Sequence, residues 1–370
     1  MKAALLHEIN APLSIDNVEL DACGPREVRI QVAASGLCHS DLHVITGDLP
    51  GPLPVVLGHE ASGIVVEVGS EVRSVVTGDH VVTSVCAYCG HCNQCLKGSS
   101  WRCLAKPARG AQDRPRITYR GQPVRQMVGL GGLAEEMLVP DTAVAVMPKE
   151  MPLDRAAVLG CAVVTGVGAV INSARVQMGE SVAVIGCGGI GLNVIQGARL
   201  AGAKVIIAID KVPSKLALAQ QFGATHVVLA DPNAAEAAIE ISQGGVDHAF
   251  EAIGLKATQA LGYSVLAPGG QLTLIGLNPV GQELALPGAF SAILTEKRVQ
   301  GSLMGSSAFQ LDLPRYASLY LQGRLKLDEL ISARLQLTQV NEGFEVMKSG
   351  AVARSVVVFD DVLEHASASG

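Results

Sequence analysis

The chain has few aromatic residues and no surplus of basic charge, and both shortages narrow its possible functions. Phe, Trp and Tyr make up 3% of the 370 residues, so we do not expect the aromatic platforms on which single-stranded nucleic acid stacks. Lys and Arg number 28 against 34 Asp and Glu, a net charge of −6, and no block of like charge forms a tail. The composition therefore disfavours a nucleic-acid partner.

Long hydrophobic runs are also missing. Hydrophobic residues make up 49% of the chain, but Gly, Pro or a charge interrupts them well before the ~20 residues that a membrane helix needs. The N-terminal residues include Lys2 and Glu8, too close together for a signal-peptide core of about 7 to 15 apolar residues. We expect a cytoplasmic protein without a membrane segment.

Nine cysteines, an odd number, suit a disulfide scaffold poorly, and five of them lie between residues 86 and 103. A tetrahedral zinc site takes four thiolates, so one is spare. Cys86, Cys89, Cys92 and Cys95 resemble an iron–sulfur ladder, but the last spacing is short by one and no Pro follows. We therefore favour Cys89, Cys92, Cys95 and Cys103 as a zinc site, which is structural because four thiolates leave no position for substrate.

Two patterns divide the chain, whose length exceeds what one hydrophobic core usually organises. Residues 1 to about 150 contain short alternating runs typical of β-strands, and residues 160 to 300 alternate apolar strands with Ala-rich helices, as βαβ units of a parallel sheet do. The predicted fold is α/β, with domains at 1–162 (including a metal lobe at 86–103) and 163–303, and a return to the first domain at 304–370. The small polar residues 364–370 are expected to be frayed.

A glycine-rich turn lies at the start of the second domain. Gly186, Gly188, Gly189, Ile190 and Gly191 follow a predicted strand, residues 181–185, and open a predicted helix, the context that a dinucleotide-binding motif requires.

An acidic residue follows this turn at the expected distance. Asp210 lies nineteen residues after Gly191 at the end of the next strand, where it can accept hydrogen bonds from the adenosine ribose and would repel a 2′-phosphate. The motif predicts NAD rather than NADP as cofactor. Lys215 is placed to reach the same ribose, although a solvated helix lysine is an equal alternative.

A second set of metal-binding residue types is spread along the sequence. Cys38 opens the run Cys-His-Ser-Asp-Leu-His, His59 lies in Gly-His-Glu, and Cys161 precedes the nucleotide motif. One His and two Cys would hold a catalytic zinc with a free fourth position for an alcohol. Such a zinc lowers the pKa of the bound hydroxyl and so favours hydride release to a nicotinamide.

These motifs, in this order and at these intervals, resemble the zinc-containing medium-chain alcohol dehydrogenases over nearly the whole chain. The resemblance implies a GroES-like, mostly β catalytic domain beside a Rossmann coenzyme domain, with two zinc ions per chain. By the same resemblance Cys38, His59 and Cys161 bind the catalytic zinc, and Glu60 lies beside it.

The resemblance also implies a proton relay and a set of coenzyme contacts. Asp41 would orient His59, while Ser40 would take the substrate proton and His43 would pass it to solvent. Contacts to the coenzyme are expected from Thr165 and Ile190 at the nicotinamide and from Arg354 at the pyrophosphate. His39, where some members have an arginine, and Ile275, at the end of a predicted strand, are further expected contacts.

The substrate is less well defined than the chemistry. An apolar pocket from Leu49, Val85, Leu277 and Leu303 favours a primary, allylic or aromatic alcohol. The branch that oxidises the glutathione adduct of formaldehyde is the alternative, although its acidic residue and its arginine are missing at Leu49 and Pro107, with Lys106 and Arg109 close to the latter.

An alternative of another class is a zinc-containing, nucleotide-binding regulatory module. The candidate proton relay argues against it, because a binding module needs none.

The long segment between Cys103 and Gly132 resembles dimeric members of the family, so we expect a homodimer, with a tetramer as the other possibility.

Overall fold

The computed structural model describes residues 1–110, 112–349 and 354–368, and the chain divides into two compact units. Unit 1 comprises Met1–Cys161 and Ala308–Gly370, and unit 2 comprises Ala162–Ser307. The predicted boundaries at residues 162 and 303 lie close to these divisions.

Unit 1 is built on strands. Its largest sheet has the order β12-β7-β6-β4-β20-β19, with β11 paired to β4. A second sheet has the order β10-β5-β1-β2 and a third the order β3-β8-β9. The strands of unit 1 are β1 (Lys2–Leu6), β2 (Ser14–Asn17), β3 (Glu19–Leu20), β4 (Glu27–Gly36), β5 (Val55–Val56), β6 (Glu60–Val68), β7 (His80–Thr83), β8 (Ile117–Tyr119), β9 (Gln122–Pro123), β10 (Arg125–Gln126), β11 (Glu136–Pro140), β12 (Val144–Val146), β19 (Ile331–Leu335) and β20 (Arg354–Val358).

The helices of unit 1 carry or flank several candidate site residues. They are α1 (His39–Thr46), α2 (Asn93–Leu96), α3 (Leu153–Val158), α10 (Phe309–Leu321), α11 (Val340–Ser349) and α12 (Asp360–Ala368). The expectation of a frayed tail is wrong for residues 364 to 368, which belong to α12, and residues 369 and 370 lie outside the described part of the chain.

Unit 2 is a parallel sheet covered by helices. Its strands β13 (Ser181–Ile185), β14 (Val205–Asp210), β15 (His226–Leu229), β16 (Val246–Glu251), β17 (Leu266–Leu274) and β18 (Arg298–Gly301) pair in the order β15-β14-β13-β16-β17-β18. This 3-2-1-4-5-6 order is the dinucleotide-binding arrangement, with a switch point beside β13. The helices are α4 (Val164–Gly168), α5 (Gly189–Ala201), α6 (Pro213–Phe222), α7 (Ala234–Ile241), α8 (Lys256–Ser264) and α9 (Ala289–Thr295).

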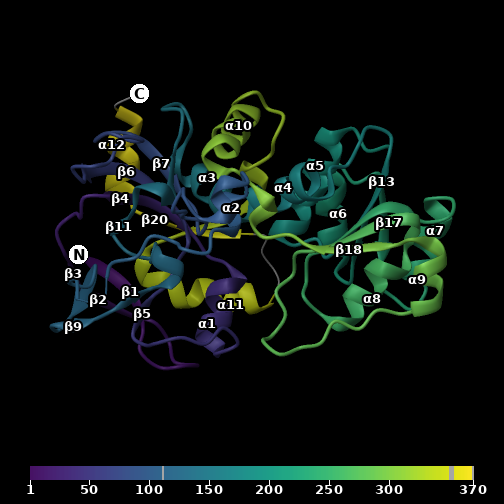
Figure 1. The fold of residues 1–370 in the computed structure, drawn as a ribbon, viewed down its shortest axis with the longest axis horizontal. Helices are drawn as coiled ribbons and strands as arrows, with labels where there is room; N and C mark the ends of the chain where they lie inside the picture. Colours follow the sequence, from purple (N-terminus) through teal and green to yellow (C-terminus); the bar gives the residue numbers. More distant parts are fainter. Residues whose placement is uncertain (111, 350–353, 369–370) are drawn as a thin grey trace. The chain divides into compact units, whose positions relative to one another are not determined.

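Burial explains why these segments form a parallel sheet. All five residues of β13 are buried, as expected for a central parallel strand covered on both faces. In Figure 1, α5 lies on one side of the strands and α8 on the other, and both helices contact β13. Gly202 ends α5 in a left-handed conformation (φ 81°), which a residue without Cβ adopts at no steric cost.

One helical stretch among the described residues has the length and composition of a membrane span. It runs over Leu153–Ala174, and 83% of its most apolar window is buried inside the protein. Two of its turns are π-helical, Leu159–Val163 and Ala169–Ala174.

Candidate active site

Four widely separated residues meet in a buried cluster of unit 1. The ligand atoms of Cys38, His59, Glu60 and Cys161 all lie within 4.8 Å of one another, and all four residues are buried. Cys38 precedes α1, Glu60 begins β6, and Cys161 lies in the π-helical turn Leu159–Val163. Such turns often occur at functional sites, and here one places a thiol that sequence spacing alone cannot position.

Charges around the cluster favour the thiolate of Cys38, while the hydrogen bond to Cys38 and burial raise the pKa of the Cys161 thiol. The pKa of the Cys38 thiol lies well below its ordinary range, chiefly because Cys161 donates a hydrogen bond to it, and the positive charge of Arg354 adds to this effect. Burial opposes the protonated form of His59, but the charges of Asp41 and Cys38 outweigh it and raise its pKa. Nδ1 of His59 lies 3.4 Å from Oδ1 of Asp41, which leaves Nε2 for a metal.

The acidic and basic members of this site form a buried pair. Nη2 of Arg354 lies 3.2 Å from Oε1 of Glu60, and its Nη1 donates to the Leu37 carbonyl. Burial raises the pKa of Glu60 to about 8. Burial would lower the pKa of Arg354, but the facing Glu60 raises it. The expected pyrophosphate contact is therefore a 5% exposed guanidinium that faces Glu60.

The donor set fits a zinc ion. Two sulfurs and an imidazole are the Cys₂His ligands of zinc sites that keep an open position. Neither carboxylate oxygen of Glu60 accepts a hydrogen bond, although both are buried, and only Oε1 has an ion-pair partner, Arg354. A buried polar atom without a partner is costly, and a cation in the cluster would satisfy Oε2.

Helix α1 presents the residues of the expected proton relay. Ser40 and His43 are three positions apart and so share one face of the helix. The Ser40 hydroxyl lies 3.7 Å from the Cys38 sulfur, and Nδ1 of His43 lies 3.1 Å from Oδ2 of Asp48. Asp41, on the same helix, accepts from the amides of Cys38 and Gly58. The carboxylate that faces His59 thus also ties two ligand-bearing segments together.

The four-cysteine cluster forms a second candidate metal site. The sulfurs of Cys89, Cys92, Cys95 and Cys103 lie within 4.8 Å of one another. Amides of Cys95 and Leu104 help to lower the pKa of Cys92 to about 6, which favours a thiolate ligand. Cys86 stands outside the cluster, and burial raises the pKa of its thiol.

The glycine-rich turn of unit 2 connects β13 to α5. A Cβ on Gly191 would lie 1.8 Å from the Gly186 carbonyl oxygen, so only glycine permits this close packing of helix on strand. A Cβ on Gly188, the residue that caps α5, would meet nothing within 4 Å. The amides at the helix N-terminus therefore lie beside open space, as a phosphate site requires.

The end of β14 holds this turn in place. Oδ2 of Asp210 accepts a hydrogen bond from the Cys187 amide at 2.8 Å, and Oδ1 accepts from the Val212 amide at 2.9 Å. Lys215 is near enough for its charge to act on the Cys187 thiol, whose pKa burial raises to about 12. Both candidate ribose contacts thus flank the glycine-rich turn.

The other predicted contacts are distributed over both units. Thr165 lies in α4, and its hydroxyl approaches the Met304 sulfur at 3.6 Å. Ile190 is half-buried in α5, Ile275 is buried after β17, and His39 is exposed at the start of α1. Of the pocket residues, Leu49 and Val85 belong to unit 1 and are half-buried, whereas Leu277 and Leu303 belong to unit 2 and are exposed.

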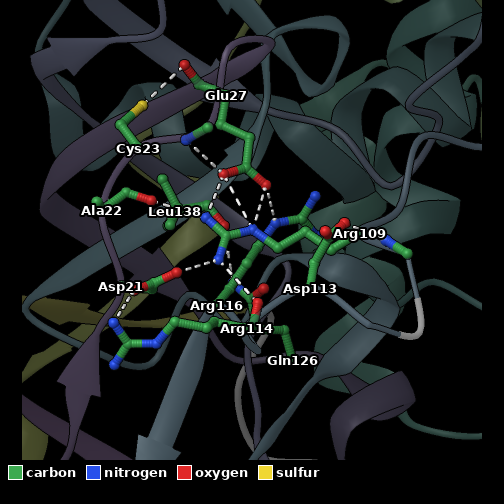
Figure 2. Close-up of polar contacts among 12 residues, drawn as sticks. Asp21, Ala22, Cys23, Glu27, Arg109, Asp113, Arg114, Arg116, Gln126 and Leu138 are labelled. Carbon is green, nitrogen blue, oxygen red and sulfur yellow. Dashed lines mark hydrogen bonds and ion pairs between the residues drawn. The ribbon is translucent and has the colours of Figure 1, made fainter.

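Arg109, which sequence analysis places near the glutathione-binding position, is fully engaged elsewhere. Figure 2 shows its guanidinium between Glu27 and Asp21. Arg109 donates to both oxygens of Glu27, to Asp21 at 2.6 Å, and to the carbonyls of Ala22 and Arg114. Arg116 donates to Glu27 as well. One carboxylate at the start of β4 therefore anchors the segment that follows the four-cysteine lobe.

This anchor predicts acid-sensitive stability. Burial opposes ionisation of Glu27, but hydrogen bonds from Arg109, Arg116 and the Gly24 amide outweigh it and hold its pKa below the ordinary value. A depressed carboxyl pKa stabilises the folded protein above the unfolded-state pKa of about 4.3, and this contribution is lost as pH falls through the folded-state value.

We expect Glu27→Gln to lower the free energy of unfolding by about 3 kcal/mol at pH 7, because two arginines lose their buried partner. Urea unfolding followed by circular dichroism at pH 7 and at pH 3 to 4 measures this, and the difference between wild type and variant should shrink at the lower pH. Glu150→Gln, at a solvent-exposed position, is the control. An equal effect at both pH values would contradict the role of the Glu27 charge.

Comparison with known proteins agrees with both units. The family model for the alcohol dehydrogenase GroES-like domain matches residues 24–149, and that for zinc-binding dehydrogenases matches residues 189–320. The chain is 36% identical over 363 residues to putative alcohol dehydrogenase D of Mycobacterium tuberculosis, with 96% of this chain and 99% of the relative covered. It belongs to the zinc-containing medium-chain dehydrogenase family.

Two further relatives of this family differ in substrate. S-(hydroxymethyl)glutathione dehydrogenase of Synechocystis sp. is 38% identical over 368 residues, with 96% of this chain and 99% of the relative covered. The crystal structure of benzyl alcohol dehydrogenase from Acinetobacter calcoaceticus superimposes with a TM-score of 0.91 at 29% identity and covers 97% of this chain and 99% of that one. Membership therefore gives a zinc-dependent oxidoreductase of the alcohol dehydrogenase type and leaves its substrate open.

Proposed function

We propose that this chain is an NAD-dependent alcohol dehydrogenase that acts on apolar primary, allylic or aromatic alcohols and their aldehydes. The observation that carries the proposal is the buried Cys38, His59 and Cys161 cluster, with Glu60 beside it. Three of these side chains are the ligand set of catalytic zinc sites, which keep a fourth position for substrate. A second cluster of four thiolates offers a structural site, so we propose two zinc ions per chain.

In the proposed mechanism, each residue near the metal cluster has a separate task. Cys38, His59 and Cys161 would hold the metal, and Asp41 would fix the orientation of the His59 ring. A bound zinc would supply a lowered pKa for the alcohol hydroxyl, and a bound NAD an acceptor for the hydride. Ser40 accepts the substrate proton, and His43, on the same face of α1, delivers it to solvent.

NAD is proposed over NADP because of Asp210. Its carboxylate stands beside the glycine-rich turn and faces amides with both oxygens. A ribose 2′-hydroxyl can donate to such a carboxylate, whereas a 2′-phosphate would meet a like charge. Thr165, Ile190, Ile275, Lys215, His39 and Arg354 complete the proposed coenzyme contacts.

An apolar substrate is favoured by the residues that line the proposed pocket and by the state of Arg109. Leu49, Val85, Leu277 and Leu303 offer hydrocarbon contacts only. The glutathione adduct of formaldehyde is the second candidate, favoured by the S-(hydroxymethyl)glutathione dehydrogenases among the relatives. Arg109 is occupied by Glu27 and Asp21, and Lys106 donates to the Val85 carbonyl at 2.9 Å. Arg109 is therefore not free to hold the carboxylates of glutathione in this arrangement, and Lys106 is an exposed side chain with one backbone partner.

The assay that tests the proposal measures NADH production by the zinc-loaded enzyme. We expect kcat/KM for benzyl alcohol or a long-chain alkanol to exceed that for formaldehyde with glutathione, and NAD to be preferred over NADP. The reverse order of substrates would favour the adduct dehydrogenase. Failure with every alcohol, despite bound zinc and NAD, would favour a regulatory module.

We also propose a homodimer in the cytoplasm. Strand β18 is an edge strand of the unit 2 sheet, and α9, which precedes it, exposes Phe290, Ile293 and Leu294 to 78, 77 and 70%. An open edge beside exposed apolar side chains is typical of an interface. All nine cysteines are free, which suits a reducing compartment. Light scattering after gel filtration would distinguish a dimer from a tetramer or monomer.

A further inference from the structure

Arg125 carries a partly buried charge that has no partner. Its backbone amide donates to the Pro54 carbonyl, but its guanidinium makes no hydrogen bond or ion pair with any residue that the structure describes. Nε is buried and unsatisfied, and burial lowers the pKa of this group with no carboxylate to oppose the effect. By contrast, Arg26, Arg109, Arg116 and Arg354 each face an Asp or Glu.

The Arg125 guanidinium occupies space that only a glycine at position 51 leaves free. A Cβ on Gly51 would lie 1.8 Å from Nη1 and 2.5 Å from Cζ of Arg125, so the charged group lies directly against the backbone of the loop over residues 47–54. The same loop carries Leu49 and Leu53, which pack on the buried cluster that includes Leu57 and Met127. The Arg125 guanidinium therefore lies against a loop whose residues 50–52 are exposed and whose Leu49 and Leu53 pack on an apolar cluster.

The segments around Arg125 are connected by backbone hydrogen bonds to the chain that carries His59. Strand β10 pairs with β5, with Arg125 opposite Val55, and amides of Gly132 and Leu133 donate to the carbonyls of Gly58 and Leu57. His59 follows Val55 by four residues, which is at most about 13 Å even for a fully extended chain. At its other end the loop meets the proton-relay helix, because the Leu49 amide donates to the His43 carbonyl at 2.9 Å.

We propose that Arg125 binds a carboxylate at the far end of an otherwise apolar alcohol substrate, and so determines specificity in the reaction proposed above. A guanidinium presents paired N–H donors that match the two oxygens of a carboxylate. The loop supplies apolar contacts for the body of the substrate, and the distance from Val55 to His59 sets the scale between its two polar ends. The carboxylate belongs either to a hydroxy acid or to a glutathione adduct, and the proposal covers both sources.

The test compares matched substrates on the zinc-loaded enzyme with NAD. The pairs are 4-(hydroxymethyl)benzoate with benzyl alcohol, and ω-hydroxyalkanoates with 1-alkanols of equal length; formaldehyde with glutathione forms a separate arm. In Arg125→Gln, the ratio of kcat/KM between the carboxylated and the neutral member should fall by about 10- to 100-fold, because a charge-assisted hydrogen bond is lost. Arg73→Gln is the control, since among the described residues the Arg73 guanidinium donates only to the backbone carbonyls of Ser70 and Val72, and its ratio should match wild type.

Two further measurements keep the outcome clear. Gly51→Ala should also lower the ratio, because the added methyl group displaces the guanidinium while keeping its charge. Calorimetric titration of the enzyme with 4-(hydroxymethyl)benzoate, without turnover, should show weaker binding to Arg125→Gln than to Arg73→Gln.

The outcomes separate this inference from the proposed function. A wild type that oxidises neutral alcohols, with an unchanged ratio and unchanged binding in Arg125→Gln, overturns the inference alone. A wild type inactive on every alcohol overturns the proposed function, and the titration still decides whether Arg125 binds carboxylate. A loss in Arg125→Gln confined to the glutathione arm supports carboxylate binding and identifies glutathione as its source.

Discussion

Replacing His59 with alanine should lower kcat/KM for an apolar alcohol by more than about 100-fold, the upper end of what losing a group beside the ligands typically costs. It should also reduce the zinc content from two ions per chain to one. The proposed zinc ligands are two thiolates and one imidazole, and no other histidine belongs to that cluster among the described residues. In His59→Ala, Cys38, Cys161 and Glu60 would remain without the neutral ligand.

Steady-state kinetics and metal analysis by mass spectrometry on the same samples check this result. His226→Ala is the control, because His226 is exposed in unit 2 and should leave both activity and metal content unchanged. If His59→Ala kept two zinc ions and an activity within tenfold of wild type, the cluster would not be the catalytic metal site.

Replacing Cys95 with serine should lower the zinc content to one ion as well, but here the main effect is on stability. The Cys95 sulfur lies 3.5 Å from that of Cys92 and 4.0 Å from that of Cys89. Helix α2, which carries Cys95, has no buried residue, so little apolar packing supports it without the metal. Because binding of a structural metal contributes directly to folding, we expect a loss on the order of 5 kcal/mol in the free energy of unfolding.

Cys86→Ser is the matched control for this lobe. Its thiol is buried but lies outside the four-sulfur cluster, so two zinc ions should remain and the destabilisation should be small. Denaturant unfolding of the three proteins, with metal analysis before and after, distinguishes the cases. A drop in zinc content in Cys86→Ser would mean that the ligand set is wrong.

Sequence analysis predicted those parts of the molecule that short-range patterns determine. The predicted strand at residues 181–185 coincides with β13, and the helix predicted to begin at the glycine-rich turn is α5, because a buried parallel strand and a glycine-rich turn each leave a local signature. The four-cysteine lobe has regular spacing, so its ligands could be proposed from the sequence. The role of Cys161 depended on family resemblance, since its position results from a π-helical turn.

Long-range pairings were beyond sequence reasoning. The sequence position of Arg109 suggests a substrate carboxylate, but its partner is Glu27, 82 residues earlier, and no local pattern links the two. The ion pair of Glu60 with Arg354 has no local signature either. A lone arginine in a strand is normally solvated, and Arg125 differs only in that its guanidinium has no partner among the described residues of the folded protein. Residues 364–368 belong to the last helix, α12, although their sequence carries no clear helical pattern.

The carboxylate of Asp210 accepts hydrogen bonds from two backbone amides, and these bonds limit how coenzyme preference could be changed by engineering. The carboxylate that would discriminate between the two coenzymes also fixes the Cys187 amide within the glycine-rich turn. A substitution chosen to admit a phosphate would therefore release the loop that must hold the pyrophosphate. Conversion to the other coenzyme needs at least two coordinated changes, one that removes the negative charge and one that restores an acceptor for that amide.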